Sequence, residues 1–444
     1  MKRMRAIVCG VLAALMLAGC GSGAGMDLTQ YAVKEAAYPA YPAAPDYDSY
    51  CDRTGTLDWD AYSTALEKYQ REMQLLGKGD RPDDGAVRRF ADRTVGKIFT
   101  GGENTVYSPI SLYVALGMLT ELTDGETKQQ VMDLLGAADA GALRQQIKKL
   151  WVSVYQDGDA VCRLANAAFL RENADVKQSA ADTLAQWYYA SSYRVPMGTE
   201  EADRAIASWL NQQTGGLLSE ETGNIRTDAD NLLRLYNTIY YKAGWWEPFK
   251  SSRTKADTFT AADGSEQRAD FMHLTETGDA LRGEGYTAAP KSLKYGRMVF
   301  VLPDEGVTPE SLLARDGFLT ELTGEYSMAD VVWSVPRFDV KSSIDLKDIL
   351  KTLGVTDAFD GNMADFTPLT DNGAMVNSVM QAARVKIDEE GVEAAAYTEI
   401  VANDSSAMIE PPPVVEMNLN RPFLFVIFDG NDVPLFVGTV QTVA

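Results

Sequence analysis

The interpretation of this chain depends on one segment near its end, Asp388-Glu389-Glu390-Gly391-Val392-Glu393-Ala394-Ala395-Ala396-Tyr397-Thr398-Glu399-Ile400. Its alanines and glutamates favour a helix, yet it directly follows a strand-like run over residues 376–387 that it could extend. In an extended conformation alternate residues face opposite sides, so one face would carry Val392, Ala394, Ala396, Thr398 and Ile400. That face is small or apolar, whereas the opposite face is largely charged or bulky. The pattern is typical of a strand that can enter a packed sheet, which makes the segment a candidate conformational switch.

The residues that follow this segment are mostly small and polar. Residues 402–408 lead towards three consecutive prolines at 411–413. Such a stretch is expected to be exposed and accessible to proteases. On composition alone, an ordinary flexible loop explains residues 388–413 equally well.

Upstream of the segment, helical patterns come first and strand patterns later. Helical periodicity covers residues 84–100, 111–122, 126–135, 139–156, 177–190 and 200–213. Strand-like runs cover residues 161–170, 232–242, 299–302, 331–340, 376–387, 423–428 and 435–440. Long separate runs of helix and strand favour an α+β domain over a βαβ repeat. Because no internal repeat is visible, residues 81–444 are interpreted as one domain.

The N-terminus has the pattern of an export signal. Three basic residues precede an apolar run over residues 6–17 that is too short to span a bilayer comfortably. The run ends in Leu17-Ala18-Gly19-Cys20, which resembles a bacterial lipobox. Residues 1–20 are therefore expected to be a lipoprotein signal peptide, with Cys20 lipidated and the protein anchored to the cell membrane, facing outside the cytoplasm. An ordinary secretory signal with a chance cysteine is the alternative.

Residues 21–80 are interpreted as a tether and N-terminal extension. Glycine-rich residues 21–25 come first, a proline-containing stretch without helical period follows, and residues 58–76 have the periodicity of one amphipathic helix. The simplest interpretation is a spacer that holds the domain off the membrane.

The residues offer no support for catalysis or metal binding. His273 is the only histidine, and no acid, cysteine or second histidine stands beside it. The sequence contains no nucleophile-elbow or metalloprotease motif, and no phosphate-binding loop that follows a strand. We therefore expect no enzyme activity, no cofactor and no metal. Outside the signal peptide and its lipidated cysteine, Cys51 and Cys162 could form one disulfide after export or stay as two thiols.

The charge balance excludes nucleic acid as a partner. The chain carries 41 basic and 63 acidic residues, a formal net charge of −22. An electrostatic field of that sign repels phosphate backbones.

Several further motifs stand in a definite order along the chain. They are Asn104-Thr105-Val106-Tyr107-Ser108-Pro109-Ile110-Ser111, Ala115-Leu116-Gly117-Met118-Leu119, Leu164-Ala165-Asn166-Ala167-Ala168-Phe169, Trp209-Leu210-Asn211-Gln212-Gln213-Thr214, Asn237-Thr238-Ile239-Tyr240-Tyr241-Lys242 with Trp245, Val335-Pro336-Arg337-Phe338 and Arg421-Pro422-Phe423. Together with the segment at 388–400, their order and spacing resemble the serpins, a family of serine protease inhibitors. The resemblance covers about residues 82–444.

The resemblance implies a serpin fold with about three β-sheets, about nine helices and an exposed reactive-centre loop. A target serine protease would attack this loop, form its acyl-enzyme, and be carried across the molecule as the loop inserts into the central sheet. The chain would then be a monomeric suicide-type inhibitor whose partner is held in a covalent complex. A heparin-type polyanion is not expected as a partner, because the net charge is strongly negative.

Residue roles follow from the resemblance by position. The insertion hinge comprises Glu389, Gly391, Val392, Ala394, Ala395, Ala396 and Thr398. The shutter, a polar cluster that holds the central sheet closed, comprises Ser108, Ser111, Asn237 and Gln381, the last of which replaces a histidine of many serpins. Trp245 lies at the breach, the upper entrance of the sheet. Plain core packing is the alternative for the shutter and breach residues.

The position of the scissile bond depends on the direction of counting. Counting forward from the hinge places it at Ser405–Ser406, with Met408–Ile409 as the runner-up. Counting backward from Pro422 ends near residues 410–411, where a proline would obstruct cleavage. Because no lysine or arginine lies between residues 387 and 421, an elastase-like or subtilisin-like target is favoured. The alternative function is a non-inhibitory serpin that acts as a surface binding protein, although the small hinge residues at 394–396 argue against it.

Overall fold

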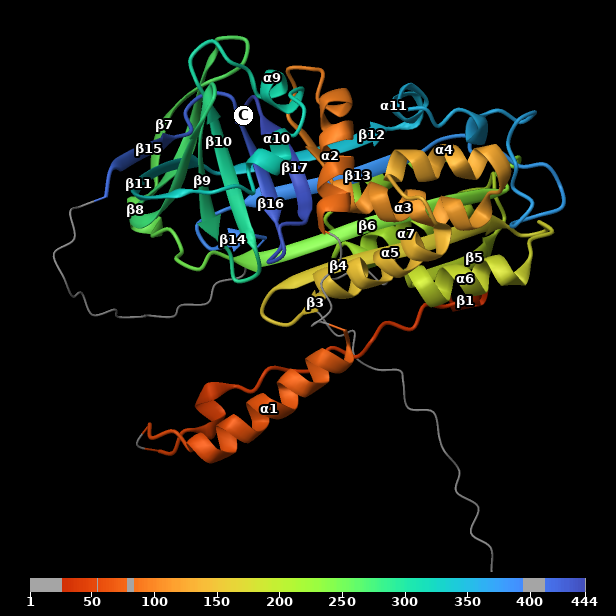
Figure 1. Cartoon of the computed structure of the whole chain (residues 1–444), viewed down its shortest axis with the longest axis horizontal. Helices are drawn as coiled ribbons and strands as arrows, with labels where there is room; N and C mark the ends of the chain where they lie inside the picture. Colours follow the sequence, from red (N-terminus) through yellow and green to blue (C-terminus); the bar gives the residue numbers. More distant parts are fainter. Residues whose placement is uncertain (1–25, 54, 78–83, 394–411, 444) are drawn as a thin grey trace, which may run out of the picture.

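A helix that is apolar on all sides lies between two sheet networks in this computed structural model (Figure 1). The structure describes residues 26–53, 55–77, 84–393 and 412–443. The helix, α3 (Pro109–Leu122), contacts β6 (Leu233–Gly244) of one network and β17 (Pro434–Val440) of the other. A helix that is hydrophobic all round is stable only when buried, so its sequence accounts for its central place. Ser108 caps its N-terminus by accepting a hydrogen bond from the Ser111 N–H.

The helices of the main body follow the sequence expectations closely in the first half of the chain. All six expected helices are present, with ends that differ by at most two residues, and four short helices that the sequence did not indicate bring the total in the described part of the main body, without the N-terminal extension, to ten. The ten helices are α2 (Asp84–Ile98), α3, α4 (Gly125–Leu135), α5 (Ala140–Val154), α6 (Gln178–Tyr188), α7 (Glu200–Gln213), α8 (Ser219–Thr222), α9 (Pro309–Leu313), α10 (Phe318–Glu321) and α11 (Lys347–Thr352).

The first network is the central sheet, in which neighbouring strands follow the order β1-β5-β4-β6-β14-β13-β12 and β3 pairs with β4. Besides β6, its strands are β1 (Ala32–Lys34), β3 (Gln156–Asp157), β4 (Val161–Arg171), β5 (Ala190–Val195), β12 (Phe338–Asp345), β13 (Met380–Ile387) and β14 (Gly391–Val392). Alternate residues of β4 belong to two different cores. Ala165, Ala167 and Phe169 pack with α7, whereas Leu164 and Ala168 join the main core. Burial on both faces explains the continuous apolar run that predicted this strand.

The second network follows the order β15-β11-β8-β9-β10-β16-β17-β2, with β7 paired to β8. Besides β17, its strands are β2 (Thr105–Tyr107), β7 (Lys255–Thr260), β8 (Glu266–Gly283), β9 (Tyr286–Ser292), β10 (Arg297–Pro303), β11 (Ser327–Pro336), β15 (Val414–Asn418) and β16 (Phe423–Phe428). The long β8 pairs with β7 and β11 along most of its length and with β9 only over its last three residues. It thus bridges two sheets, which with the central sheet make the expected three, and the α+β prediction is confirmed.

Two of the expected strands have different limits in the structure. The run 331–340 is split between β11 and β12, which belong to different networks. The break falls at Pro336 and Arg337, because proline ends the ladder by lacking an N–H group. The run 376–387 is a strand only from Met380, since the Val376 N–H donates to the Ala358 carbonyl instead of to a strand.

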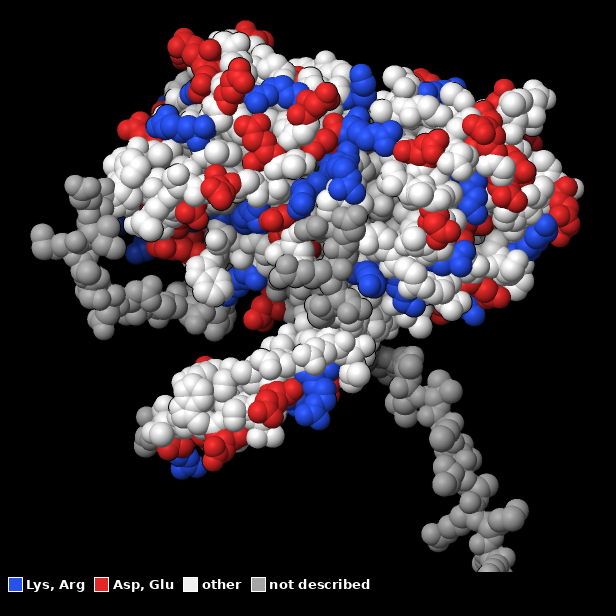
Figure 2. Space-filling view, in the orientation of Figure 1, with Lys and Arg blue, Asp and Glu red and all other residues white. Residues whose placement is uncertain are grey.

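The described part of the N-terminal extension has two portions that differ in their contacts. The predicted helix is present as α1 (Trp59–Leu75) and stands to one side of the main body (Figures 1 and 2). Before it, β1 pairs antiparallel with β5 and adds an edge strand to the central sheet. The interpretation of residues 21–80 as a mere spacer is therefore incomplete, because this strand is part of the sheet. No helix within the described ranges is long and apolar enough to cross a membrane.

Candidate functional site

The central sheet contains a two-residue strand, β14, between the ends of two longer strands. Val392 pairs with Ala243 of β6 on one side and with Ile387 of β13 on the other, and both pairings are antiparallel. Within the described residues no ladder joins β6 to β13 directly, so β14 alone bridges them. The chain beyond Glu393, which includes Ala394, lies outside the described residues. The predicted hinge thus begins between two strands whose facing edges it could pair along.

Gly391 allows this entry because its Cα lies very close to the backbone of β6. A Cβ atom at this position would lie 2.3 Å from the Ala243 carbonyl oxygen and 2.6 Å from the Gly244 Cα. Its φ of 155° is also one that residues with side chains rarely adopt. Glycine is therefore required by close approach as well as by backbone conformation.

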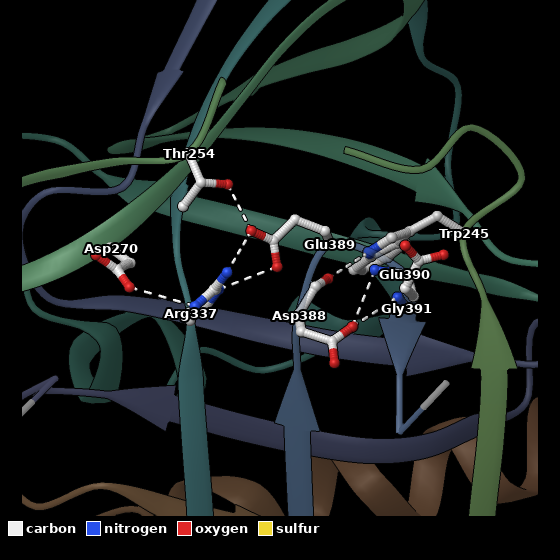
Figure 3. Close-up of polar contacts among 8 residues, drawn as sticks. All are labelled: Trp245, Thr254, Asp270, Arg337, Asp388, Glu389, Glu390 and Gly391. Atoms are coloured by element: carbon white, nitrogen blue, oxygen red, sulfur yellow. Dashed lines mark hydrogen bonds and ion pairs between the residues drawn. The ribbon is translucent and has the colours of Figure 1, made fainter. Parts of the chain in front are cut away.

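The turn before Gly391 is held by its own aspartate and by Trp245 (Figure 3). The Asp388 Oδ1 accepts hydrogen bonds from the N–H groups of Glu390 and Gly391, at 2.9 and 3.3 Å. Trp245 is fully buried, and its indole Nε1 donates to the Asp388 carbonyl at 2.9 Å. Its backbone N–H donates to the Glu390 carbonyl at 2.8 Å. Trp245 thus lies directly against the start of the hinge, where the breach was predicted.

Among the described hinge residues, Glu389 has three hydrogen bonds to its carboxylate (Figure 3). Arg337 donates to both of its carboxylate oxygens, at 2.6 and 3.0 Å, and the Thr254 hydroxyl donates to Oε1 at 2.5 Å. Burial would raise the pKa of Glu389, but the hydrogen bonds from Arg337 and Thr254 outweigh burial and lower that pKa. Arg337 also forms an ion pair with Asp270 at 3.2 Å. A bidentate pair with a buried carboxylate ties the hinge to the junction of β11 and β12.

The two hinge residues after Gly391 face opposite sides of the sheet. Val392 is 2% exposed and packs in the main core. Glu393 lies on the other face, where burial raises its pKa to about 7 despite the neighbouring Lys242 and Arg384. Its Oε2 atom has no hydrogen-bond partner among the described residues. This alternation agrees with the expected inward Val392 and outward Glu393.

The four predicted shutter residues meet below α3 and link it to both strands that flank β14. Gln381 of β13 accepts a hydrogen bond from the Ser108 N–H at 2.9 Å and donates to the Ser108 carbonyl at 3.0 Å. The Ser111 hydroxyl donates to the Asn237 side chain of β6. The Asn237 amide donates in turn to Asn166 of β4, whose own amide donates to the Tyr188 carbonyl at 2.6 Å. One polar network therefore spans β13, α3, β6 and β4.

A cavity of about 100 Å³ lies beside this network, between β6 and β13. Its walls include Leu235 and Asn237 of β6, Gln381 of β13, and Leu116 and Leu119 of α3. This cavity lies further along the gap between β6 and β13 that β14 enters at residues 243–244 of β6. The two strands are therefore separated both beside β14 and further along their length.

Several predicted site residues cannot be placed. Residues 394–411 lie outside the described residues, as do residues 1–25; they include Ala394, Ala395, Ala396, Thr398, Ser405, Ser406, Met408, Ile409 and Cys20. Cys51 and Cys162 are both free thiols, and Cys162 is buried. No group of acidic, histidine and cysteine side chains suited to a metal ion occurs in the described part of the chain.

Sequence reasoning missed three residues that complete the site. Asn166 extends the shutter network, while Arg337 and Thr254 hold Glu389. Asn166 and Arg337 both lie within motifs quoted for the resemblance; for Asn166 the available signal was a polar residue in an otherwise apolar strand, and for Arg337 a charged residue directly after a proline between two strand-like runs. Thr254 carried no local signal.

The chain is similar to known proteins over most of its length. A family model described as Serpin (serine protease inhibitor) matches residues 86–443. Serpin-Z1A of Triticum aestivum is 30% identical over 377 residues, which is 79% of this chain and 94% of that protein. Among solved structures, a thermophilic serpin, Tengpin, in its native state has a TM-score of 0.72 at 24% identity, covering 81% of this chain and 93% of that chain. Human thyroxine-binding globulin has the same TM-score at 21% identity, with 81% and 98% covered. At these identities both structures support the fold alone.

Proposed function

This chain belongs to the serpin family, and from that premise we propose that it is a suicide-type inhibitor of serine proteases. Its fold is the serpin fold, and serpins are typically protease inhibitors that do not themselves catalyse a reaction. The observation that carries the proposal is the place of Gly391 and Val392, which pair with β6 and β13 where those two strands share no ladder of their own in the described chain. A loop that continued from Val392 would find unpaired strand edges on both sides.

The proposed reaction uses the chemistry of the protease and the conformational change of the inhibitor. The protease serine attacks the carbonyl carbon of Ser405, the peptide bond to Ser406 breaks, and the new amine takes a proton from the protease histidine. The acyl group stays on the serine as an ester. Insertion of the freed hinge then pulls the protease along the sheet and disturbs its oxyanion site and triad, so that water does not hydrolyse the ester.

The alternation at Val392 and Glu393 supplies a matched test of insertion. By the same alternation Ala394 would enter facing the core and Ala395 would face away from it. Ala394→Arg would bury an unpaired charge, which costs several kcal/mol, whereas Ala395→Arg should be tolerated. We expect the Ala394 variant to become a cleaved substrate and the Ala395 variant to remain an inhibitor. The measurement is the number of inhibitor molecules consumed per protease trapped, together with complexes that survive boiling in detergent. Equal values for both variants would refute insertion.

An elastase-like or subtilisin-like protease is the proposed target. The support is the absence of lysine and arginine between residues 387 and 421. Mass spectrometry of the peptide released on cleavage locates the bond. A peptide that begins at Ser406 is expected, and one that begins at Ile409 would move the site to Met408.

We also propose that the protein is exported and lipid-anchored through Cys20. Met26, six residues further on, lies against α7, and the strand that follows pairs near the end of β5 that is remote from β14. The described chain therefore begins at the end of the sheet remote from β14, which is compatible with an anchor upstream of Met26. Cys20→Ser should abolish lipid labelling and release the protein from membranes. Unchanged membrane fractionation would reject the anchor.

A non-inhibitory binding role is the second candidate, and the fold is compatible with it. One solved structure with a similar fold is that of a thyroxine-binding globulin, so the same fold also occurs in a protein that is named for binding a ligand. The same protease panel separates the two roles. Cleavage of the loop without any detergent-stable complex, for every serine protease tried, would favour the binding role.

A further inference from the structure

Three consecutive carbonyl groups in the turn before β14 are held by the short segment that follows β6. The Asp388 and Glu390 carbonyls accept hydrogen bonds from the indole and the backbone N–H of Trp245, at 2.9 and 2.8 Å. The Glu389 carbonyl accepts from the Phe249 N–H at 3.0 Å. Trp245 and Phe249 are both buried, and their rings meet edge to face with centroids 6.0 Å apart. The place of these two residues therefore fixes the turn from which the hinge enters the sheet.

A buried lysine lies against both rings of this segment. Lys291, on β9, is 1% exposed, and its Nζ atom lies 4.8 Å from the centre of the Phe249 ring and 5.8 Å from that of the Trp245 ring. A third ring, that of Trp333 on β11, has its centre 6.0 Å away. Aromatic faces attract an ammonium group at such distances, and more strongly where water is excluded. The charge of Lys291 thus attracts the two side chains whose residues hold the hinge turn.

One carboxylate fixes the ammonium group. Glu276 of β8 forms an ion pair with Lys291 at 3.0 Å, and its same oxygen accepts from the Trp333 indole at 2.8 Å. Burial lowers the pKa of Lys291 by more than the carboxylates of Glu276 and Glu247 raise it. A buried ion pair is weak evidence for stability, because apolar side chains of similar volume are often as stable in its place. Its effect is therefore sought in the placement of its neighbours.

Glu276 and Trp333 belong to the strands that carry the chain after the reactive loop. Glu276 lies on β8, which pairs with β11, and Trp333 of β11 is in register with Met417 of β15. β15 begins at Val414, directly after the residues expected to form the loop. Lys291 therefore lies between the two attachments of the loop, with the hinge turn at one end and β15 at the other.

We propose that Lys291 is a positioning residue of the inhibitor. Its ammonium group, held by Glu276, keeps Trp245 and Phe249 in place and through them the turn from which the hinge enters the sheet. The proposal rests on the insertion mechanism proposed above and names a residue that controls its first step. Insertion extends a strand from β14, so it starts faster when the entropy of ordering the first hinge residues has already been lost. Without a fixed turn, insertion starts later and deacylation releases more of the protease.

The test compares full-length variants with and without the buried charges. Lys291→Met combined with Glu276→Gln removes both charges together, so that neither is left buried without its partner. The glutamine oxygen can still accept from the Trp333 indole. Lys250→Met is the matched control, because it removes an exposed lysine next to Phe249.

Amide hydrogen exchange at Trp245 and Phe249 is the first measurement, because these N–H groups donate to the hinge turn. We expect exchange there to be about tenfold faster in the double variant than in the wild type and the control. Val426, buried in the middle of β16, reports on global unfolding, and its exchange should change by less than about twofold. The number of inhibitor molecules consumed per subtilisin trapped should rise at least about twofold, while the rate of loop cleavage stays the same.

Exchange at Trp245 and Phe249 within about twofold of the wild-type rate overturns the positioning role. An equal acceleration at Val426 does the same, because the effect would then be a global loss of stability. Faster local exchange without a rise in consumption would show that the turn does not control trapping.

Should the double variant fail to fold, Phe249→Leu carries the same measurements, because it keeps the N–H group but removes the ring nearest to the ammonium. Exchange at residue 249 that is no faster than in the wild type would then reject the proposal. If the wild type itself traps no protease, the proposed function fails, while the exchange rates still decide whether Lys291 holds the hinge turn.

Discussion

At the scale of single residues, Gly391 decides whether the hinge can pair with β6. The 2.3 Å approach of a Cβ atom to the Ala243 carbonyl leaves no room for any side chain. We expect Gly391→Ala to expel β14 from the sheet and to speed amide hydrogen exchange at Val392. The free energy of unfolding should fall by no more than about 1–2 kcal/mol, because only a two-residue strand is lost. Gly430→Ala is the control, since a Cβ atom there would have nothing within 4 Å. Unchanged exchange at Val392 in the Gly391 variant would contradict this account.

Glu389 supplies a pH-dependent contribution to stability whose sign follows from its environment. Its pKa is lowered in the folded protein by the hydrogen bonds from Arg337 and Thr254, which outweigh burial. A carboxylate of this kind stabilises the fold fully above its unfolded pKa of about 4.3, and the contribution is lost as the pH falls through the lower folded value. Glu389→Gln should cost about 1.5–3 kcal/mol at neutral pH and progressively less below about pH 4.

Urea unfolding of the Glu389 variant and the wild type across this pH range is the measurement. Asp270→Asn is the matched control, because it removes the partly exposed partner of the same Arg337 and should cost at most about 1 kcal/mol. A difference between wild type and Glu389→Gln that stays constant down to pH 3 would show that the ion pair is not its source.

At the scale of elements, the shutter network decides how α3 is joined to the two strands beside β14. Gln381 accepts from the Ser108 N–H and donates to the Ser108 carbonyl, which also accepts from the Leu112 N–H at 3.3 Å, and Gln381 and Ser108 are both buried. Gln381→Leu leaves the Ser108 N–H without this partner, at about 1–3 kcal/mol, and removes one of the two hydrogen bonds to the Ser108 carbonyl. Met380→Leu is the control, because Met380 is half-exposed one position away on the same strand. We expect a lower melting temperature and faster spontaneous loop insertion for the Gln381 variant only. Equal melting temperatures for the two variants would contradict a structural role for the network.

The sequence predicted elements best where one local signal was enough. Five of the six early helices are amphipathic and α3 is a long apolar run, while β4, β16 and β17 are continuous apolar runs, so the limits of these elements agree within about two residues. The long β8 escaped prediction because its first part alternates exposed and half-buried polar residues. The three residues of β1 carry no strand signal at all, since their pairing depends on the distant edge of β5.

For the site, sequence order predicted residues but not the contacts between them. The structure places the shutter residues in one network and Trp245 against Glu390 and Asp388, while of the hinge only Glu389, Gly391 and Val392 lie within the described residues. The functional roles of all these positions stay predictions. Thr254 could not be found, because its contact with Glu389 spans more than a hundred residues and arises only from the packing of a loop. The sequence could not indicate the raised pKa of Glu393, because that shift is caused by burial in the folded protein and not by neighbours along the chain.

At the scale of the whole molecule, β6 and β13 share no ladder of their own within the described chain. Under the proposed insertion mechanism, the described form would not be the most stable one available to the chain. If cleavage lets about ten hinge residues enter between these strands, each would gain backbone hydrogen bonds worth about 1 kcal/mol net. The sum is on the order of 10 kcal/mol, and each kcal/mol raises the melting temperature of a domain this large by about 2 °C. The small cavity between the two strands would also be filled, which adds apolar contacts.

We therefore expect loop cleavage by subtilisin to raise the melting temperature of the wild type by roughly 20 °C. Differential scanning fluorimetry of intact and cleaved protein measures this shift. In the cleaved Ala394→Arg variant the gain should largely disappear, because a charge that blocks entry of the hinge also withholds the new hydrogen bonds. In the cleaved Ala395→Arg variant the gain should be retained. A full gain in both variants would mean that the added stability does not come from the hinge entering the sheet. If cleavage raises the melting temperature of neither the two variants nor the wild type, the gap between β6 and β13 is a fixed feature of the fold.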